Sequence, residues 1–205
     1  MKIILATPLY PPDIAEPAPY VKELASKLGQ KHQVTIVTYG NTPQEISGAK
    51  IITVNKGQAV IIRLLKYTWK LFRTSRGADV IYVQNGPSVD LSVILVGGLR
   101  NVPVVVRFSH DKAWERAKQL GLSHKNQEDF LKSPENNLQI GLITALQKFA
   151  FRRAKILTSP SIYMSCLISD SYNINKKHSI ALYSPPEKIQ VLPFPSPIVP
   201  YQILI

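Results

Sequence analysis

Nearly uninterrupted runs of valine, isoleucine, leucine and tyrosine recur along this 205-residue chain, and they limit its possible folds more than any other feature. Strands with one face in water alternate apolar and polar residues, whereas continuous apolar runs indicate strands that are covered on both faces. The seven strand candidates are Lys2–Thr7, Gln33–Tyr39, Lys50–Val54, Asp79–Gln84, Pro103–Phe108, Lys155–Thr158 and Lys188–Leu192.

Segments with the composition and spacing of helices separate most of these runs. The helix candidates are Tyr20–Leu28, Gln58–Arg76, Val89–Arg100, Ile140–Ala154 and Ser161–Ser171. Strands that alternate with helices predict a mostly parallel sheet with right-handed crossovers. We therefore expect a Rossmann-like α/β domain, with a sheet of about seven strands flanked by helices.

The first forty residues read as a strand, a proline-rich loop, a helix and a second strand. Five prolines lie between Pro8 and Pro19, but the loop has no glycine. A fold that binds NAD or FAD needs G-x-G-x-x-G here, because the backbone must approach a pyrophosphate. The loop therefore argues against a nicotinamide or flavin cofactor.

Charge and cysteine content narrow the possible surroundings of the chain. The 25 Lys and Arg residues outnumber the 13 Asp and Glu residues, which gives a net charge of +12. A basic surface attracts phosphate in nucleic acids, lipid headgroups or nucleotides, or serves solubility alone. No motif for reading nucleic acid is present, so we expect no specific nucleic-acid partner. The single cysteine, Cys166, has apolar neighbours that indicate a buried thiol and fit a reducing compartment.

No segment has the character of a transmembrane helix or a signal peptide. The longest apolar run, Val93–Leu99, is far shorter than the ~20 residues that span a bilayer. The apolar stretch Ile3–Ala6 is too short for the core of a signal peptide and ends at Pro8. We therefore expect a cytoplasmic protein, with peripheral attachment to the inner face of the membrane as one possibility.

The helix candidate Gln58–Arg76 has a basic face. Its members are Arg63, Lys66, Lys70, Arg73 and Arg76, at steps of three and four residues. The opposite, apolar face is expected to contain Leu64, Leu65, Thr68, Leu71 and Phe72, with Tyr67 and Trp69 near the borders. Such a helix suits an anionic membrane surface, but it equally suits a sheet-packing helix with a solvated basic face. A second basic cluster contains Lys148, Arg152, Arg153 and Lys155.

Two regions interrupt the alternation of strands and helices. Ser109–Leu138 follows the fifth strand, where we expect one short helix and then a polar loop to Pro134; open α/β folds bind ligands at this edge of the sheet. Pro193–Ile205 is rich in proline and ends in apolar residues. We therefore expect residues 1–193 to form the domain, with 194–205 as an apolar tail or the start of a linker.

Several segments, in order along the chain, resemble family-4 glycosyltransferases, which have two Rossmann-like halves in the GT-B fold. The first is Tyr10-Pro11-Pro12 with Tyr20-Val21-x-x-Leu24-Ala25-x-x-Leu28 and the strand Val34–Thr38. The others are Ala78–Val83, Pro103–Asp111, Arg153–Ser161 and Pro186–Pro193. Each motif is weak alone, but the ordered set covers nearly the whole chain and indicates the N-terminal, acceptor-side half of this fold.

The resemblance implies a retaining glycosyltransferase that moves a sugar from a nucleotide-sugar to an acceptor, which in many members is lipid-linked. The matching histidine of the family lies at the cleft between the halves, so His110 is the candidate for catalysis; without the resemblance, it reads as part of a helix start with Asp111 as the N-cap. The resemblance and the loop positions make further residues candidates for substrate binding: Tyr10, Ala15, Glu16, Asn85, Asp111 and Lys112. For Asn85, the residues themselves favour a role in an Asn-Gly turn over contact with the acceptor.

Two departures from the family pattern concern the donor. The family has Gly-Gly where this chain has Ala15 and Glu16, and a methyl group and a carboxylate both disfavour a close diphosphate. The family's donor-binding half is also missing, so this chain is expected to hold no cofactor itself, and the nucleotide-sugar belongs to the complete enzyme. No His, Cys and carboxylate spacing suits a metal site. The alternative is a degenerate or split-subunit domain that binds a partner or a membrane without catalysis.

Overall fold

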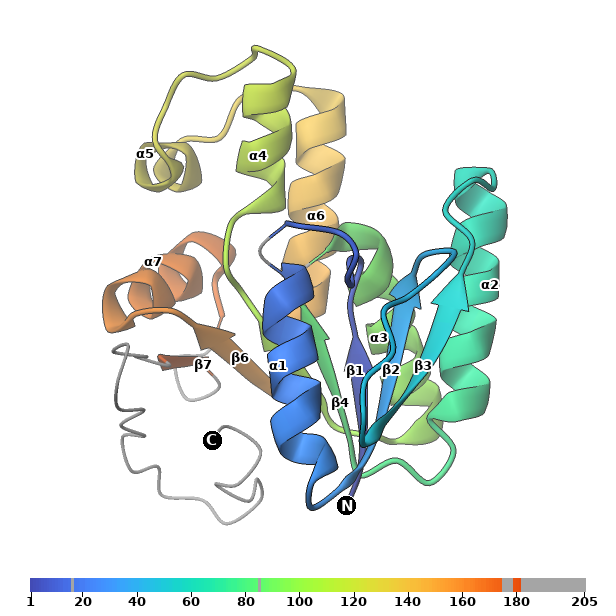
Figure 1. Cartoon of the computed structure of the whole chain (residues 1–205). Coiled ribbons are helices and arrows are strands. Elements are labelled where there is room, and N and C mark those ends of the chain that lie inside the picture. The colour runs from blue at the N-terminus through green and yellow to red at the C-terminus, as the bar shows by residue number, and fades with distance from the viewer. Residues whose placement is uncertain (16, 85, 175–178, 182–205) are drawn as a thin grey trace.

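Within the described part of the chain, seven parallel strands form one sheet in the order β3-β2-β1-β4-β5-β6-β7 (Figure 1). The computed structural model describes residues 1–15, 17–84, 86–174 and 179–181. The strands are β1 (Lys2–Ala6), β2 (Gln33–Tyr39), β3 (Ala49–Val54), β4 (Val80–Gln84), β5 (Val104–Arg107), β6 (Ile156–Ser159) and β7 (Ser179–Ala181). The expected Rossmann-like α/β class is therefore confirmed.

Helices cover both faces of this sheet. They are α1 (Pro17–Gly29), α2 (Val60–Thr74), α3 (Pro87–Arg100), α4 (Lys112–Gln119), α5 (Gln127–Lys132), α6 (Leu138–Arg153) and α7 (Ile162–Tyr172). Helix α1 lies against one face, whereas α2, α3 and α6 lie behind the sheet in the view of Figure 1. All five predicted helices are present, with ends that differ by a few residues.

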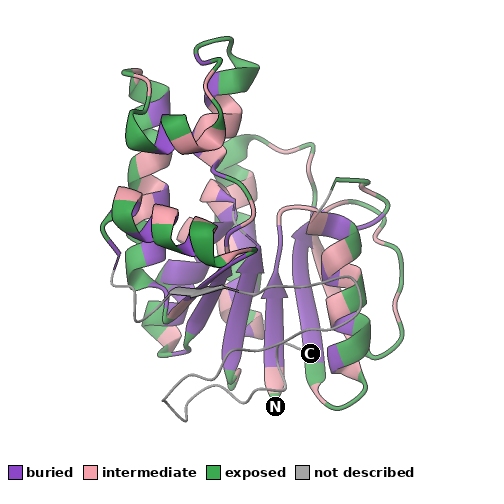
Figure 2. Cartoon of the chain, turned by 90° about the vertical axis from the view of Figure 1, so that its left-hand side faces the viewer, coloured by how far each residue is buried: buried purple, intermediate pink, exposed green. Residues whose placement is uncertain are grey.

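The central strand β1 shows why the apolar runs do not alternate. Ile3 and Leu5 pack into the cluster that contains α1, whereas Ile4 and Ala6 pack into the cluster that contains α2 and α3. All four side chains are almost fully buried, and Figure 2 shows the strands buried between the outer layers. A strand covered on both faces has no position left for a polar residue, which accounts for the sequence pattern.

Three expectations need correction. The region expected to be a polar loop contains α5, because Phe130 packs with Ala113, Ala117 and Ile140 in a small separate core. Strand β7 was not predicted, since three residues are too few for a recognisable pattern. The strand candidate Lys188–Leu192 and the tail 194–205 lie outside the described residues.

Cys166 is the third correction, because its side chain is exposed. The buried residues of α7 are Ser165, Ile168, Ser169 and Tyr172, which form a single helical face. Cys166 lies outside that face, so apolar neighbours in the sequence did not indicate burial. Among the described residues, no helix is long and apolar enough to cross a bilayer.

Two adjacent glycines of α3 have different surroundings. A Cβ added to Gly97 would lie 2.5 Å from Val104 Cγ2 on β5 and 3.1 Å from the carbonyl oxygen of Val102, whereas a Cβ on Gly98 would meet nothing within 4 Å. Gly97 therefore allows α3 to approach the sheet closely, and Gly98 faces open space.

We expect Gly97→Ala to lower the free energy of unfolding by about 1–3 kcal/mol, because the methyl group overpacks the contact with β5. Gly98→Ala is the matched control and should be neutral or stabilising by up to about 1 kcal/mol, since alanine favours the helix. Chemical denaturation followed by circular dichroism measures both, and equal effects of the two substitutions would contradict this account of the packing.

Candidate functional site

All seven strands are parallel, so their carboxyl ends meet at one edge of the sheet. The strand order changes direction between β1 and β4. Strands β2 and β3 are added on one side of β1, whereas β4 and the strands after it are added on the other side. Open α/β folds bind ligands outside the carboxyl ends of the strands at such a reversal. The loops after β1, β4 and β5 are therefore the first places to look for a site.

His110 lies in the connection from β5 to α4, and its side chain is exposed. The next residue, Asp111, is the N-cap of α4, and its Oδ1 accepts a hydrogen bond from the Trp114 amide at 2.8 Å. The expected cap is therefore confirmed. The cap determines where the helix begins, and so it determines where the backbone of His110 lies.

Asp111 is itself completely buried, and side chains from two later helices hold it. Oδ2 accepts hydrogen bonds from the Tyr172 hydroxyl on α7 and from Gln147 Nε2 on α6, the latter at 3.3 Å. Gln147 Oε1 in turn accepts from the Ala113 amide at 3.1 Å. We call Asp111, Gln147 and Tyr172 the buried clamp, because together they join three helices beneath His110.

The clamp has a definite electrostatic character. Burial raises the pKa of the Asp111 carboxyl, although the hydrogen bonds from Tyr172, the Trp114 and Ala113 amides and Gln147 oppose that shift. Burial and the neighbouring carboxylate also raise the pKa of the Tyr172 hydroxyl, which therefore keeps its proton and remains the donor. The Asp111 carboxylate is hydrogen-bonded within the protein, so it holds the start of α4 in place beside His110.

A second buried carboxylate lies where β4 meets α3. Asp90 Oδ2 accepts from the Gly86 amide at 3.0 Å, as expected for a helix start, but Oδ1 has no hydrogen-bond partner among the described residues. Burial raises the pKa of Asp90 well above its usual range, and the charge of Lys112 partly offsets this. Asn85 lies outside the described residues. Among the residues that the structure describes, Asp90 Oδ1 is therefore an unsatisfied polar atom at the carboxyl edge.

Arginine and aromatic side chains form the next part of this edge. Arg107 Nη1 donates to Gln84 Oε1 at 3.1 Å, and the Arg107 guanidinium lies 4.0 Å from the centroid of the Tyr20 ring. The Tyr20 hydroxyl is 3.2 Å from the hydroxyl of Tyr82. The start of α1 is thus bound to the ends of β4 and β5, and the sequence motifs did not single out Arg107.

The candidates in the loop after β1 have different environments. Tyr10 is buried and lines a cavity near β2, whereas Ala15 is exposed and its carbonyl accepts from the Ala18 amide at 2.9 Å as α1 begins. Glu16 lies outside the described residues. Tyr10 therefore lies at the carboxyl ends of β1 and β2, whereas His110 and Lys112 follow the carboxyl end of β5. The candidates share one edge of the sheet but form two separate groups.

The sequence missed two residues that join this loop to its neighbours. Lys56, just after β3, forms an ion pair with Asp13, with Nζ 2.7 Å from Oδ1 and 2.5 Å from Oδ2. The only indications in the sequence were the turn-like Asn55-Lys56-Gly57 and an acidic residue after a proline pair. Lys112, a predicted binding residue, pairs with Glu115 at 2.9 Å.

The two faces of α2 differ from those expected. Tyr67, which was expected at a border, is completely buried and donates to the Val37 carbonyl at 2.8 Å, whereas Leu65 and Trp69 are 65% and 60% exposed. Helix α2 is oriented with Tyr67 towards the sheet because the buried Tyr67 hydroxyl has a hydrogen-bond acceptor on β2. Leu65 is therefore not part of the buried face, and Trp69 belongs to the solvent-exposed one.

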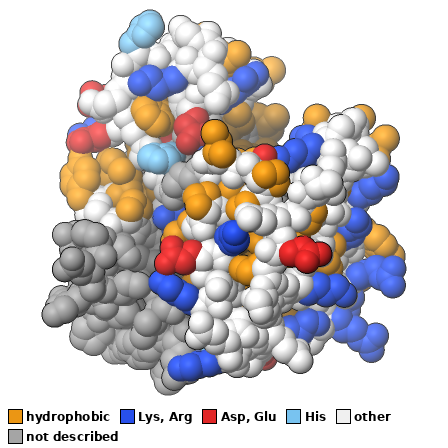
Figure 3. Space-filling view, in the orientation of Figure 1, with side chains coloured by type: hydrophobic (Ala, Val, Ile, Leu, Met, Phe, Trp, Pro, Cys, Tyr) orange, Lys and Arg blue, Asp and Glu red, His pale blue; other side chains and the backbone are white. Residues whose placement is uncertain are grey.

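The basic residues of α2 also divide into two groups. Arg63 is half-buried, with its guanidinium 5.1 Å from the centroid of the Tyr39 ring, and Lys70 donates to the Thr53 carbonyl at 2.6 Å. Lys66 and Arg73 are exposed. Arg76 is also exposed, but it lies beyond the end of α2 at Thr74 and is therefore not on the predicted helix face. Lys and Arg side chains gather at the edge of the molecule that α2 forms, as Figure 3 shows.

Exposed apolar residues accompany this charge on three neighbouring helices. Helix α3 packs against both α2 and α6. We call the exposed apolar residues of these helices the outer apolar surface: Val60, Ile61, Ile62, Leu65, Trp69, Leu95, Leu99, Leu138, Leu142 and Phe149. The second basic cluster, which includes the exposed Arg152 and Arg153, lies at the end of α6. Within the described ranges, no group of three His, Cys, Asp or Glu residues is arranged to hold a metal ion.

The chain belongs to the family of glycosyl transferase 4-like domains, whose model matches residues 16–174. Its fold is that of one half of the GT-B architecture, as the resemblance implied. No curated protein sequence matches the chain.

Several solved structures share this fold. Anabaena HepE, solved in complex with UDP, is 15% identical with a TM-score of 0.57, over 89% of this chain and 44% of HepE. The UDP-GlcNAc 2-epimerase of Methanocaldococcus jannaschii is 12% identical with a TM-score of 0.55, over 89% and 45%. A Rickettsia africae glycosyltransferase is 12% identical with a TM-score of 0.52, over 89% and 42%. The chain thus spans less than half the length of these proteins.

We expect Tyr172→Phe to lower the free energy of unfolding by about 1–3 kcal/mol, because a buried carboxylate loses a donor. The loss should be larger near pH 7 than near pH 4.5, since the hydroxyl stabilises the ionised form of Asp111 and the raised pKa means that acid removes that charge. Denaturant unfolding at the two pH values measures this. Tyr163→Phe, an exposed position on the same helix, is the control, and a loss of equal size there would contradict the role of the clamp.

Proposed function

We propose that this chain is the acceptor half of a retaining glycosyltransferase, which transfers a sugar from a nucleotide-sugar to an acceptor at a membrane surface. The observation that supports this most directly is the position of His110 in a chain of this family. It lies at the carboxyl edge of the sheet, on a helix start that the buried clamp holds. The clamp fixes the backbone from which the His110 side chain extends, and accurate positioning of a reacting group favours catalysis.

The role of His110 follows from the chemistry of imidazole. Negative charge develops on the leaving diphosphate when a sugar is transferred, and a nearby imidazole N–H stabilises it by hydrogen bonding. The clamp itself touches no substrate in this proposal. It determines the position of the backbone at His110, while the exposed side chain reaches the reacting groups.

The donor nucleotide-sugar is assigned to another half, either later in the same polypeptide or in a partner subunit. The chain aligns with less than half of HepE, which was solved with UDP. The loop after β1 supports the assignment, since Ala15 replaces a glycine of the family pattern at the point where a diphosphate would approach. The domain itself would extend over residues 1–193, with 194–205 leading towards the missing half.

The outer apolar surface and its basic neighbours are proposed to rest on an anionic membrane. Trp69 and Leu65 supply apolar area, and Lys66, Arg73 and Arg76 flank them with positive charge. Apolar insertion and electrostatic attraction to anionic lipids add together in peripheral binding. The proposed site of action is the cytoplasmic face of a membrane, where a lipid-linked acceptor would be available.

The second candidate is a binding or membrane-docking module without catalysis. Ala15 is the observation that favours it, because it departs from the family pattern in the one loop that approaches the donor. Both candidates share the membrane surface, but only the first requires His110.

We expect His110→Ala to lower kcat for sugar transfer by roughly 10²–10³-fold, the usual cost of removing a donor to developing charge. The assay uses the protein that joins this chain to its donor-binding half, and His124→Ala, at an exposed position on a different loop, serves as control. His110→Gln, which keeps an N–H donor, should recover part of the rate. Full transfer by His110→Ala would support the non-catalytic module instead.

Isolated, this 205-residue chain should show no submicromolar affinity for nucleotide-sugars, because the proposed donor half is elsewhere. Isothermal titration calorimetry with UDP-sugars and GDP-sugars measures this directly. Tight binding of any of them would overturn the division of labour between the halves, whatever the outcome of the His110 assay.

We expect wild-type protein to sediment with vesicles that contain phosphatidylserine, and Lys66, Arg73 and Arg76 changed together to Gln to weaken this roughly 100-fold. The estimate takes about 1 kcal/mol for each basic residue near the surface. The control changes the exposed Lys27, Lys31 and Lys118 to Gln, which removes the same charge from other surfaces. The fluorescence of Trp69 should shift to the blue on binding. Equal losses in both triple variants would mean that net charge alone is responsible.

A further inference from the structure

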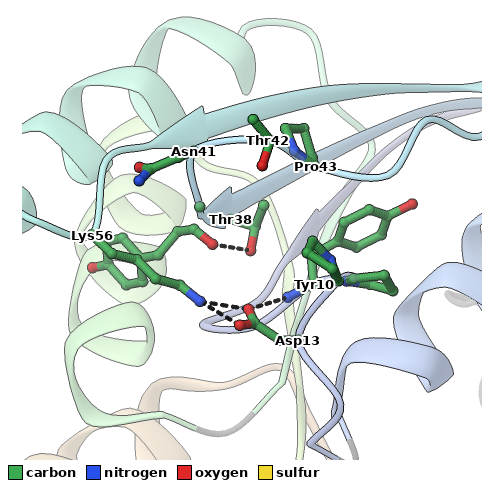
Figure 4. A pocket seen from close by; sticks show the side chains of 11 residues that line it. Tyr10, Asp13, Thr38, Asn41, Thr42, Pro43 and Lys56 are labelled. Atoms are coloured by element: carbon green, nitrogen blue, oxygen red, sulfur yellow. Dashed lines mark hydrogen bonds and ion pairs between the residues drawn. The ribbon is translucent and has the colours of Figure 1, made fainter.

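A cavity lies at the carboxyl edge, between three loops and away from His110. Its volume is about 200 Å³, and it is lined by residues from the loop after β1, from the end of β2 with the loop that follows, and by Lys56 after β3. Figure 4 shows the Asp13 carboxylate and the Lys56 ammonium paired at one side, with Asn41, Thr42 and Pro43 across the cavity. We call it the three-loop pocket.

Contacts between the loops hold this pocket in shape without a ligand. The Gln44 amide donates to the Pro11 carbonyl at 3.0 Å, which joins the loop after β2 to the loop after β1. The ion pair of Asp13 and Lys56 joins the loops after β1 and β3. Arg63 Nη1 donates to the Lys56 carbonyl at 3.3 Å, which attaches the pocket to the first turn of α2. A pocket formed in advance loses less entropy when it binds a ligand.

The size of the pocket restricts its ligand. Pockets for drug-sized ligands measure about 300–1,000 Å³. A cavity of about 200 Å³ therefore suits one ring of monosaccharide size.

The polar groups of the pocket indicate a neutral ligand that is rich in hydroxyl groups. The charges of Asp13 and Lys56, the two charged side chains that line the pocket, compensate each other in an ion pair. A phosphate or carboxylate would have to displace Asp13 from Lys56 and accept repulsion from the freed carboxylate. Sugar hydroxyls, in contrast, can donate to the carboxylate and accept from the ammonium while the pair remains. Asn41 and Thr42 add neutral donors and acceptors.

An exposed apolar turn lies beside the pocket. Val60, Ile61 and Ile62 form the first turn of α2, and all three are exposed, Ile61 to 71%. The bond from Arg63 to the Lys56 carbonyl holds this turn against the pocket wall. A sugar in the pocket can therefore carry an apolar substituent that lies over the turn.

We propose that the three-loop pocket binds one neutral monosaccharide unit of a glycolipid acceptor, with the lipid directed over Val60–Ile62. The inference rests on the proposed acceptor role of the chain, and it names the substrate class. Asp13 and Lys56 recognise the hydroxyls, and the exposed turn provides the contact that distinguishes a lipid-borne sugar from a free one.

The test uses NMR titration of the 15N-labelled chain with methyl and octyl glycosides of glucose, galactose, mannose and N-acetylglucosamine, below the micelle concentration. At least one methyl glycoside should shift the amides of Gly40, Asn41 and Thr42. Its octyl counterpart should bind at least about tenfold more tightly, since burial of about two methylenes suffices for this. It should also shift the amides of Val60–Ile62.

Asp13→Asn sharpens the test, because it frees Lys56 from its partner. This variant should lose at least about fivefold in glycoside affinity and gain binding of inorganic phosphate, a change of ligand that misfolding does not produce. Glu128→Gln breaks the ion pair with Lys132 on α5 and is the matched control, with no change for either ligand. The amide spectrum of each variant reports whether the fold is kept.

Three results would overturn the proposal. In the first, no glycoside shifts the amides of Gly40–Thr42. In the second, phosphate shifts these amides in the wild-type chain as much as the glycosides do. In the third, the octyl glycosides shift only the amides of Val60–Ile62. If the glycosides fail while His110→Ala still abolishes sugar transfer, the pocket assignment alone is wrong and the proposed function remains.

Discussion

Burial of the parallel sheet on both faces is the constraint on which the rest of this structure depends. The side chains of Ile3–Ala6 in β1 point alternately into the α1 cluster and the α2–α3 cluster, and all four are almost fully buried. Apolar burial contributes roughly 25 cal/mol for each Å² removed from water, so both layers are needed to stabilise the sheet. Polar side chains such as Gln84 and Arg107 then lie at the carboxyl ends of the strands and in the loops that follow them.

Those loops are held by polar groups that are themselves buried. Asp111 and Asp90 have raised pKa values because burial disfavours their charge, and hydrogen bonds from Tyr172, Gln147 and the Gly86 amide oppose this. Such groups stabilise little in total, because desolvation offsets much of each hydrogen bond. These groups fix the helix starts in one defined arrangement. Such an arrangement helps a site that must position a side chain accurately.

The carboxyl edge and the outer helices are proposed to act together. The three-loop pocket adjoins the first turn of α2, and the same helix contributes Leu65, Trp69 and Lys66 to the proposed membrane surface. A glycolipid held at that surface would therefore have its sugar near the edge where His110 lies. One helix thus connects the two proposed functions of this half: docking on the bilayer and binding of the acceptor.

Much of the fold was evident from the sequence, for identifiable physical reasons. Six of the seven strands and five helices were predicted, because burial on both faces and helical periodicity leave strong patterns. The cap at Asp111 followed from a local rule. The sequence by itself therefore determined the parallel sheet, its family and the edge where a site would form.

The tertiary structure alone decided which side chains meet. Asp13 and Lys56 are 43 residues apart, and Asp111 and Tyr172 are 61 apart, so no local pattern pairs them. The turn of α2 that buries Tyr67 and exposes Leu65 and Trp69 depends on a partner on β2. Phe130 makes α5 a packed helix only because α4 and α6 lie beside it. The periodicity of apolar residues predicts which face of a segment is buried. Which residues pack against that face is decided only when the chain has folded.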